Sequence, residues 1–231
     1  MPDQTTAAAA TSAMMPMPAD RASGMTNWSP ALLLPIGLRL LACLAQASFM
    51  HSSLITYMAD TSRVTVLILL ISETASFLGL VLSRQAKVVD YDPRAFMLIL
   101  VAYSYMIFLT TNPVVHLMSE QVSATIQIIG LSWTIYAKIS IGRSFGLLPA
   151  NRGLVVTGAY RWVRHPIYAG YFVNHVGYIA ANFCLWNLVI LALLYVAQFL
   201  RLVREEMLLA HSSEYLEYAR RVRYRIIPGV V

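Results

Sequence analysis

Residues 185–209, with the sequence LWNLVILALLYVAQFLRLVREEMLL, decide the fold class of this 231-residue chain. The run from Leu188 to Leu200 is apolar apart from Gln198, and the charged residues gather at the carboxyl end of the stretch. A helix over these residues is long enough to cross the roughly 30 Å hydrocarbon core of a bilayer. The stretch therefore predicts a membrane-spanning helix.

The composition of the whole chain agrees with this prediction. Hydrophobic residues make up 58% and charged residues 12%, and the mean hydropathy is +0.62. Such a chain is too apolar for a soluble domain of its length, which indicates an integral membrane protein. The net charge of +6 comes from basic residues between apolar runs, where the positive-inside rule explains them, so we exclude nucleic acid as a partner.

Other apolar runs recur along the chain at close to the length of a membrane span. We expect an all-α, polytopic integral membrane protein with about six transmembrane helices. Short junctions at 111–113 and 182–186 predict that the third and fourth helices, and the fifth and sixth, form antiparallel hairpins. A five-span alternative, with the last hairpin only partly inserted, stays open. The six runs are 30–52, 62–83, 95–111, 114–137, 166–182 and 185–209.

The chain divides into three regions by composition. Residues 1–28 are rich in Ala, Thr, Met and Pro and lack the basic and apolar segments of a signal peptide, so we expect a disordered tail. Residues 29–139 carry the first transmembrane helices. Residues 140–231 form the predicted catalytic region, with the last helical hairpin, a basic tail and a cytosolic cofactor site.

Basic residues lie mostly on one side of the predicted spans. A cytoplasmic amino terminus puts nearly all interhelical arginines and lysines on the cytoplasmic side and leaves Arg63 on the other. This asymmetry favours an even number of spans, with both termini and the active site in the cytoplasm. The residues on the basic side include Arg84, Lys87, Arg94, Lys138, Arg143, Arg152, Arg161, Arg164, Arg220, Arg221, Arg223 and Arg225.

The first two predicted spans each carry a charged residue well inside the apolar run. Arg39 lies in the first and Glu73 in the second, and a charge in lipid is costly unless it is paired or hydrated. We expect an interhelical ion pair, with a role in a substrate path as the alternative. The histidines and the two cysteines have no second ligand at metal-binding spacing, so we predict no metal site.

Residues 158–170, with the sequence GAYRWVRHPIYAG, place a cationic and aromatic cluster where a polar loop meets an apolar helix. Pro166 suits the first helical turn, which puts His165 near the cap. The free N–H groups of such a helix end, together with Arg164, predict a site for a carboxylate or phosphate. Gly170, one turn further, permits the close approach of another backbone or a ligand.

The predicted last helix carries a second polar cluster. Arg201 and Glu205 are four residues apart and share a face, whereas Glu206 points about 100° away around the helix. Arg201 follows the apolar run, where it could reach an acidic group on a lipid-soluble molecule. Glu205 could accept hydrogen bonds from an amine or a ribose. The simplest alternative is an ordinary ion pair between Arg201 and Glu205.

Three stretches, 154–170, 201–206 and 215–228, together resemble the isoprenylcysteine carboxyl methyltransferase family, within a wider group that includes phospholipid N-methyltransferases. The resemblance covers about residues 140–230. It implies methyl transfer from S-adenosylmethionine, bound at the cytosolic face, to a lipophilic or lipidated acceptor in the membrane. The motifs are Leu154-Val155-x-Thr157-Gly158-x-Tyr160-Arg161-x-x-Arg164-His165-Pro166-x-Tyr168-x-Gly170, Arg201-x-x-x-Glu205-Glu206, Tyr215-x-x-Tyr218-x-x-x-Val222 and Arg225-x-x-Pro228.

The resemblance also implies roles for single residues. Arg201 matches the position that contacts the acceptor carboxylate, and this is the predicted catalytic residue. Asn151 and Arg152, just before Leu154, stand where the eukaryotic enzymes of the family carry a different, more hydrophilic stretch. The implied cofactor-binding residues are Gly153, Leu154, Val155 and Tyr160 around the adenosine, His165, Pro166, Ile167 and Tyr168 on the fifth helix, and Glu205 on the sixth.

Three alternatives accompany this prediction. Membrane sterol reductases, which bind NADPH, share the Arg-His-Pro-x-Tyr-x-Gly element and an ending like residues 224–229, but Glu205 and Glu206 stand where a phosphate binder would carry positive charge. A phospholipid N-methyltransferase would need a base, for which Glu206 or Glu73 is the candidate. A non-catalytic scaffold or transporter lacks supporting repeats or broken helices. The identity of the acceptor stays open.

Overall fold

The computed structural model describes residues 30–82, 88–89, 93–111, 115–142, 150–151 and 154–229. The predicted tail of residues 1–28 lies outside this range. The same holds for Gly153 and for the basic loop residues Arg84, Lys87, Arg143 and Arg152. The side chain of Arg39 is also outside the described part, so its predicted pair with Glu73 remains a prediction.

Each of the six predicted apolar runs overlaps a helix, although α1, α3 and α4 extend beyond the runs predicted for them, and a seventh helix follows α6. The all-α prediction is confirmed for the described residues, where the strands are two residues long each and pair antiparallel. A short 3₁₀ helix, η2, precedes α5. The elements are α1 Pro30–Ala59, α2 Val64–Leu82, β1 Val88–Val89, α3 Pro93–Phe108, α4 Glu120–Ile141, β2 Ala150–Asn151, η2 Gly158–Arg161, α5 Pro166–Ala181, α6 Leu185–Leu209 and α7 Ser213–Arg221.

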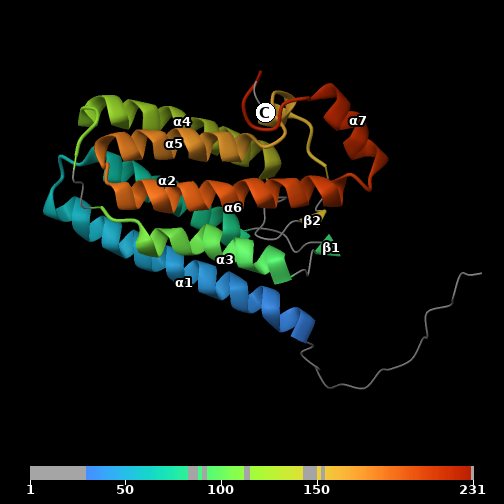
Figure 1. Cartoon of the computed structure of the whole chain (residues 1–231), viewed down its shortest axis with the longest axis horizontal. Coiled ribbons are helices and arrows are strands. Elements are labelled where there is room, and N and C mark those ends of the chain that lie inside the picture. Colours follow the sequence, from blue (N-terminus) through green and yellow to red (C-terminus); the bar gives the residue numbers. More distant parts are fainter. Residues whose placement is uncertain are drawn as a thin grey trace, which may run out of the picture.

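The long helices pack side by side with roughly aligned axes (Figure 1). The closest packing joins α4 to α5, while α3 packs against α6 and α1, and α2 packs against α1 and α4. In Figure 1, α7, β1 and β2 lie at the right-hand end of the bundle, where α5 begins and α6 ends. The segments that carry the predicted site motifs therefore gather at one end of the bundle.

The predicted hairpin of the third and fourth helices is wrong in its length and packing. The α4 helix begins at Glu120 instead of 114, because the Ser119 side chain caps it by accepting a hydrogen bond from the Val122 N–H (3.4 Å). The connection instead crosses to the turn between α5 and α6, where Val115 and Phe183 exchange backbone hydrogen bonds of 3.1 and 3.0 Å. As a result, α3 packs against α1 and α6 rather than against α4.

The short junction between the fifth and sixth helices is confirmed. The α5 helix ends at Ala181 and α6 begins at Leu185. Cys184 caps α6 through its sulfur, which accepts a hydrogen bond from the Asn187 N–H at 3.3 Å. This capping gives Cys184 a structural role in the turn.

Small residues set the close contact of α4 with α5. A Cβ atom added to Gly170 would lie 2.2 Å from the Thr134 hydroxyl and 2.9 Å from the Gly130 carbonyl oxygen. Contacts this short leave no room for a side chain, so the two backbones approach closely, as small residues allow in membrane helices. Of the two possibilities predicted for Gly170, the structure shows the approach of another backbone.

The bundle is apolar on the outside and partly polar inside. Large apolar side chains such as Met58, Ile139 and Leu185 are exposed, whereas Gln46 and Gln127 are fully buried. Among the described residues, α6 is long and apolar enough to cross a bilayer, and shorter apolar stretches lie in α2 and α3. A protein that contacts lipid has this distribution, because lipid tails accept apolar side chains and polar groups face inward.

Candidate functional site

The junction of η2 with α5 has the predicted cap. His165 is the N-cap residue of α5 and Pro166 occupies its first turn, where a missing N–H costs no hydrogen bond. The Pro166 carbonyl accepts a hydrogen bond from the Trp133 indole of α4 (2.9 Å). The His165 ring also stacks on the Tyr168 ring, with centroids 5.8 Å apart. These contacts fix where the helix begins.

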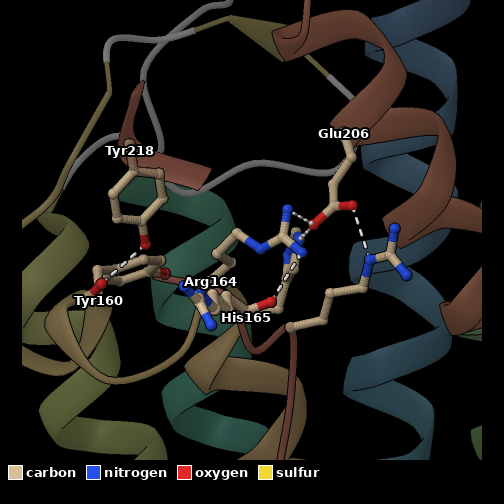
Figure 2. A network of polar contacts seen from close by, with 7 residues as sticks. Tyr160, Arg164, His165, Glu206 and Tyr218 are labelled. Atoms are coloured by element: carbon tan, nitrogen blue, oxygen red, sulfur yellow. Dashed lines mark hydrogen bonds and ion pairs between the residues drawn. The ribbon is translucent and has the colours of Figure 1, made fainter. Parts of the chain in front are cut away.

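Glu206 of α6 joins three segments of the chain through one carboxylate (Figure 2). Its Oε1 atom lies 3.0 Å from a guanidinium nitrogen of Arg164 and 3.2 Å from Nε2 of His165. Its Oε2 atom accepts a hydrogen bond from Nε of Arg225 at 2.8 Å. We call these four residues the Glu206 cluster. The side chains of Glu206, Arg164 and His165 are at most 12% exposed, so the cluster lies mainly inside the protein.

The tail after α7 pairs with the loop that leads into α5. The Arg164 N–H donates to the Tyr224 carbonyl (2.9 Å), and the His165 N–H donates to the Arg225 carbonyl (2.7 Å). The Arg164 guanidinium also reaches the Arg223 carbonyl (3.2 Å). The chain itself therefore fills part of the anion site predicted at this helix cap. Glu206 forms an ion pair with Arg164, and a carbonyl of the tail accepts the hydrogen bond of the His165 N–H.

Helix α7 covers the loop before η2. Tyr215, Tyr218 and Val222 form a buried cluster against which Leu154 and Val156 pack. The Tyr218 hydroxyl donates to the Tyr160 carbonyl oxygen at 2.8 Å. Burial raises the pKa of the Tyr218 hydroxyl to about 12, so it stays protonated and able to donate at neutral pH.

The Tyr160 side chain is buried and interacts electrostatically with Glu205. Burial raises the pKa of the Tyr160 hydroxyl, and the nearby Glu205 carboxylate raises it further. Arg201 and Glu205 both interact electrostatically with the Tyr168 hydroxyl. Arg201 and Tyr168 also line the same cavity. Glu206, on a different side of the helix, belongs to the cluster described above.

A polar cavity lies inside the bundle, next to Arg201. Its empty space measures about 540 Å³, including the part that opens outward. Residues from α1, α2, α3, α5 and α6 line it, and Arg201 itself is only 8% exposed. The polar residues of the lining are Gln46, Glu73, Ser76, Tyr105, Tyr168, Tyr171, His175, Gln198 and Arg201.

An apolar groove adjoins this polar cavity. It measures about 700 Å³, including its open part, and the tail residues Ile226 and Ile227 form part of its wall. Tyr168 and Gln198 line both spaces. The remaining lining is aromatic, from Phe172, Tyr195 and Phe199 of α5 and α6. A molecule with a polar head and an apolar chain could therefore occupy both spaces at once.

The predicted cofactor residues do not all have the same surroundings. His165 and Tyr168 lie at the start of α5 and Tyr160 lies in η2. Tyr160 and Tyr168 interact electrostatically with Glu205, whereas His165 contacts Glu206. The side chain of Ile167, in contrast, packs into the core against Ala137 of α4 and Ala159 of η2. Leu154 and Val155 are half-buried, Leu154 packs against the tyrosines of α7, and Pro166 is buried. Gly153 lies outside the described residues.

Sequence reasoning missed the polar residues that α1, α3 and α5 contribute to the cavity. Gln46 donates to both the backbone carbonyl and the side-chain Oε2 of Glu73, each at 2.8 Å. The Tyr105 hydroxyl contacts Glu73 and His175, each at 3.3 Å. Their signal in the sequence was a set of polar side chains inside apolar runs, but the sequence analysis predicted an interhelical role only for Glu73 and Arg39.

Comparison with known proteins supports the sequence resemblance. Residues 117–211 match the model of the isoprenylcysteine carboxyl methyltransferase (ICMT) family. This segment belongs to the ICMT family. The match spans α4, α5 and α6 with the Arg164-His165-Pro166 cap. A search of curated proteins gave no match.

The ICMT segment carries Arg201, Glu205 and Glu206, together with the residues around the α5 cap. The family consists of methyltransferases associated with membranes, and the match to it covers residues 117–211 of this chain. Helices α1–α3, which contribute Gln46, Glu73 and Tyr105 to the cavity, lie outside the match. Within the described residues there is no group of three or more His, Cys, Asp or Glu side chains that could hold a metal ion.

Proposed function

We propose that this protein transfers a methyl group from S-adenosylmethionine to the carboxylate of a lipophilic acceptor within the membrane. The observation that carries the proposal is the position of Arg201. This guanidinium lines a polar cavity whose wall, at Tyr168 and Gln198, is shared with an apolar groove. A cation at the junction of a polar and an apolar space suits a molecule with an acidic head and an apolar chain.

The acceptor would lie across both spaces. Its apolar chain would occupy the groove against Phe172, Phe199 and Ile226. Its carboxylate would meet Arg201, whose two parallel N–H donors can hold both carboxylate oxygens. Such a paired interaction orients the reacting oxygen as well as binding it. This arrangement favours a carboxylate acceptor over the amine that an N-methyltransferase would require.

The cofactor would bind on the water-exposed side of Arg201, one helical turn further along α6. Glu205 is half-buried and interacts electrostatically with Tyr160 and Tyr168. A carboxylate next to aromatic rings fits the ribose hydroxyls or the ammonium group and the adenine of S-adenosylmethionine. His165, with its ring stacked on Tyr168, and the half-buried Leu154 and Val155 would complete the site, with Gly153, Pro166 and Ile167 contributing mainly through the backbone.

For this reaction the side chains mainly need to bind and orient the reactants. S-adenosylmethionine, when bound, supplies an electrophilic methyl group on a sulfonium. A carboxylate is already ionised at neutral pH, so the chain need not provide a general base. Arg201 would hold the nucleophilic oxygen in line with the methyl group, and orientation of this kind accounts for much of the rate of such displacements.

Water must be kept out of the site, because it weakens the interactions that align the reactants. The tail residues Ile226 and Ile227 form part of the groove wall, and Arg225 binds Glu206 beside the α5 cap. We propose that the tail acts as a cover over the site. We also propose that α1–α6 span the bilayer, with both termini and the site on the cytoplasmic side, as the basic loops indicate.

Equilibrium binding of labelled S-adenosylmethionine and of NADPH to the detergent-solubilised protein tests the cofactor. We expect saturable binding of S-adenosylmethionine and none of NADPH. Turnover with labelled cofactor and a long-chain thioether carboxylic acid then tests the reaction, since a methyl ester releases its label as methanol in base and an N-methyl group does not. Binding of NADPH alone, or a base-stable product, would refute the proposal.

A further inference from the structure

A chain of hydrogen bonds connects the apolar groove to the polar cavity. Tyr195 of α6 lines the groove, whereas His175, Tyr105 and Glu73 line the cavity. The Tyr195 hydroxyl lies 2.7 Å from Nδ1 of His175. On the other side of the ring, Nε2 lies 3.3 Å from the Tyr105 hydroxyl, which donates to Oε1 of Glu73 at 3.3 Å. Side chains from α6, α5, α3 and α2 thus join the two spaces.

The hydrogen bonds of this chain all have the same direction. The Tyr105 hydroxyl has one proton, and the Glu73 carboxylate accepts it. The Tyr105 oxygen can therefore only accept from His175, which makes Nε2 the donor nitrogen of the ring. In a neutral imidazole the other nitrogen is an acceptor, so Nδ1 accepts from the Tyr195 hydroxyl. A proton that enters at Tyr195 can thus pass from group to group and reach Glu73.

Glu73, at the end of this chain, shares the cavity with Arg201 and interacts electrostatically with Lys138 of α4. A second carboxylate in the cavity would repel Glu73, and of two carboxylates that share a site one tends to take up a proton. The titratable groups around Glu73 and His175 are Tyr105 on α3, Lys138 on α4, Tyr168 and Tyr171 on α5, and Tyr195 and Arg201 on α6, while α1 contributes the uncharged Gln46.

An acid acceptor brings such a second carboxyl group into the cavity. In water that group is ionised, but a charge in an apolar medium is costly, so a lipophilic acid moves along the groove in its neutral form. It must lose its proton before its oxygen can attack a methyl group. Tyr195 lines the groove, and its oxygen can accept that proton while its own proton passes to His175.

We propose that Tyr195, His175 and Tyr105 carry the proton of the acid acceptor to Glu73, which holds it while the acceptor carboxylate pairs with Arg201. This inference rests on the proposed function, because it adds the ionisation that precedes methyl transfer.

The transfer leaves the number of protons in the site unchanged. The O–H bond of the acid breaks, its electron pair stays on the carboxylate, and an O–H bond forms at Oε1 of Glu73. Each tyrosine receives one proton and gives up one, and His175 exchanges its Nε2–H for an Nδ1–H. Methyl transfer then converts the carboxylate into a neutral ester, so Glu73 releases its proton, and the hydroxyls and the ring reorient to restore the chain.

Infrared difference spectroscopy locates the proton without turnover. The full-length protein is saturated with S-adenosylhomocysteine and then with a long-chain thioether carboxylic acid labelled with ¹³C at its carboxyl group, which separates the bands of the acid from those of the protein. We expect a labelled carboxylate band together with a new unlabelled carboxylic acid band. Glu73→Gln should abolish the new band.

Glu120→Gln is the matched control for this measurement. Glu120 is a half-buried glutamate at the opposite end of α4 from Lys138, where its Oε1 accepts from the Thr65 N–H at 2.6 Å. It lies outside the chain of hydrogen bonds, so this variant should keep the new band. If Glu73→Gln does not fold, Tyr195→Phe replaces it in the kinetic test below.

The pH dependence of kcat/KM tests the path of the proton. Tyr195→Phe removes the first hydroxyl and keeps the ring, so it should lose about tenfold in kcat/KM at about pH 6, where the acid arrives neutral, and stay within about twofold of the wild type at about pH 9, where the acid is already ionised. His175→Gln keeps a donor and an acceptor, but an amide does not relay protons, so it should behave in the same way.

Tyr178→Phe is the control for these two variants, because Tyr178 is a fully buried tyrosine of α5 that lines neither space. Its kcat/KM relative to the wild type should be the same at both pH values. An equal loss at both pH values in Tyr195→Phe would indicate a structural role and overturn the inference, while methyl transfer itself would stand. If the protein methylates no acid, the infrared measurement still decides, since the new band supports the proton path without turnover and its absence refutes it.

Discussion

The His165 imidazole and the Glu206 carboxylate lie 3.2 Å apart, although 41 residues separate them in the chain. This contact joins the beginning of α5 to the last turns of α6. Arg225 binds the other oxygen of the same carboxylate, so the tail is fixed to the same point (Figure 2). Glu206 therefore serves as an internal anchor, whereas its neighbour Glu205, which is outside this cluster, is proposed to bind the cofactor.

The two adjacent glutamates should respond differently to the same substitution. Glu206→Gln removes the charge that pairs with Arg164 and Arg225 and leaves a largely buried guanidinium without its anion. Loss of one partner of a buried pair costs about 3 kcal/mol. We expect a clear fall in the thermal unfolding temperature of the detergent-solubilised protein, measured without cofactor.

Glu205→Gln is the matched control for that experiment. It changes the same chemical group one position earlier in α6, outside the Glu206 cluster, so the unfolding temperature should stay within the error of the measurement. If Glu205→Gln destabilised the apo protein as much as Glu206→Gln, the assignment of Glu206 as the anchor would be wrong.

Arg201 and Glu205 should divide the two ligands between them. Arg201→Ala should lower kcat/KM for the acceptor by about a hundredfold or more, because it removes a paired charge from a buried site, and S-adenosylmethionine should still bind. Glu205→Ala should instead raise the cofactor Kd by about 10- to 100-fold. Calorimetric titration of each variant with the cofactor measures the difference, and an equal loss in both variants would contradict the division.

The sequence predicted the helices well because each long helix carries its own evidence, in an apolar run or a cap. Pro166 after His165 marked the start of α5 correctly. The start of α4 was placed six residues early, since residues 114–119 are apolar enough to extend the run. The α4 helix begins only at Glu120, because Ser119 caps it and Val115 forms a bridge with Phe183. That bridge depends on the arrangement of segments that are distant in the chain.

The site was predictable only where it resembles a known family. Arg201 and Glu205 share a face by spacing alone, but nothing local shows that Glu206 meets Arg164, His165 and the tail, because those contacts join residues far apart in the chain. The position of Gln46 in the cavity was likewise not predictable, since a lone glutamine in an apolar helix gives no indication of which cavity it lines. Glu73 was recognised as unusual, yet its contact with Gln46 required the packing of α1 against α2.

Gly170 should be intolerant of any side chain. A Cβ atom there would meet the Thr134 hydroxyl and the Gly130 carbonyl of α4 at 2.2 and 2.9 Å. Gly170→Ala must push α4 and α5 apart, at a cost of about 1–3 kcal/mol, and should lower the unfolding temperature. Gly37→Ala is the control, because nothing lies within 4 Å of its added Cβ; it should leave stability unchanged or slightly higher. Equal tolerance at both positions would argue against the close helix contact.

The proposed topology can be checked by labelling introduced cysteines with an impermeant thiol reagent in sealed vesicles. Cysteines at Gln85 and Ser212 should react only when the cytoplasmic face is accessible, and a cysteine at Thr61 only from the opposite face. Thr61 and Ser212 lie at opposite ends of the bundle because α2–α6, an odd number of helices, connect them. Labelling of both from the same face would exclude the arrangement of six spans.

The tail should be necessary for ligand binding, and the first residues of the chain should not be. Deletion of 222–231 removes the carbonyl partners of the Arg164 and His165 N–H groups and the Arg225 side chain bound to Glu206. It also removes the Ile226 and Ile227 wall of the apolar groove. We expect a cofactor Kd about tenfold higher and a loss of most turnover, while the protein still inserts into membranes because α1–α6 precede the deletion.

Removal of residues 1–24 is the matched control, since it shortens the chain at the other end without touching any residue of the cavity, the groove or the Glu206 cluster. That variant should keep the cofactor affinity and turnover of the full chain. The two deletions together distinguish a cover from a surface anchor. A basic segment that only attaches the protein to anionic lipid would leave the cofactor Kd in detergent unchanged when it is deleted, whereas a cover over the site raises that Kd even where no bilayer is present.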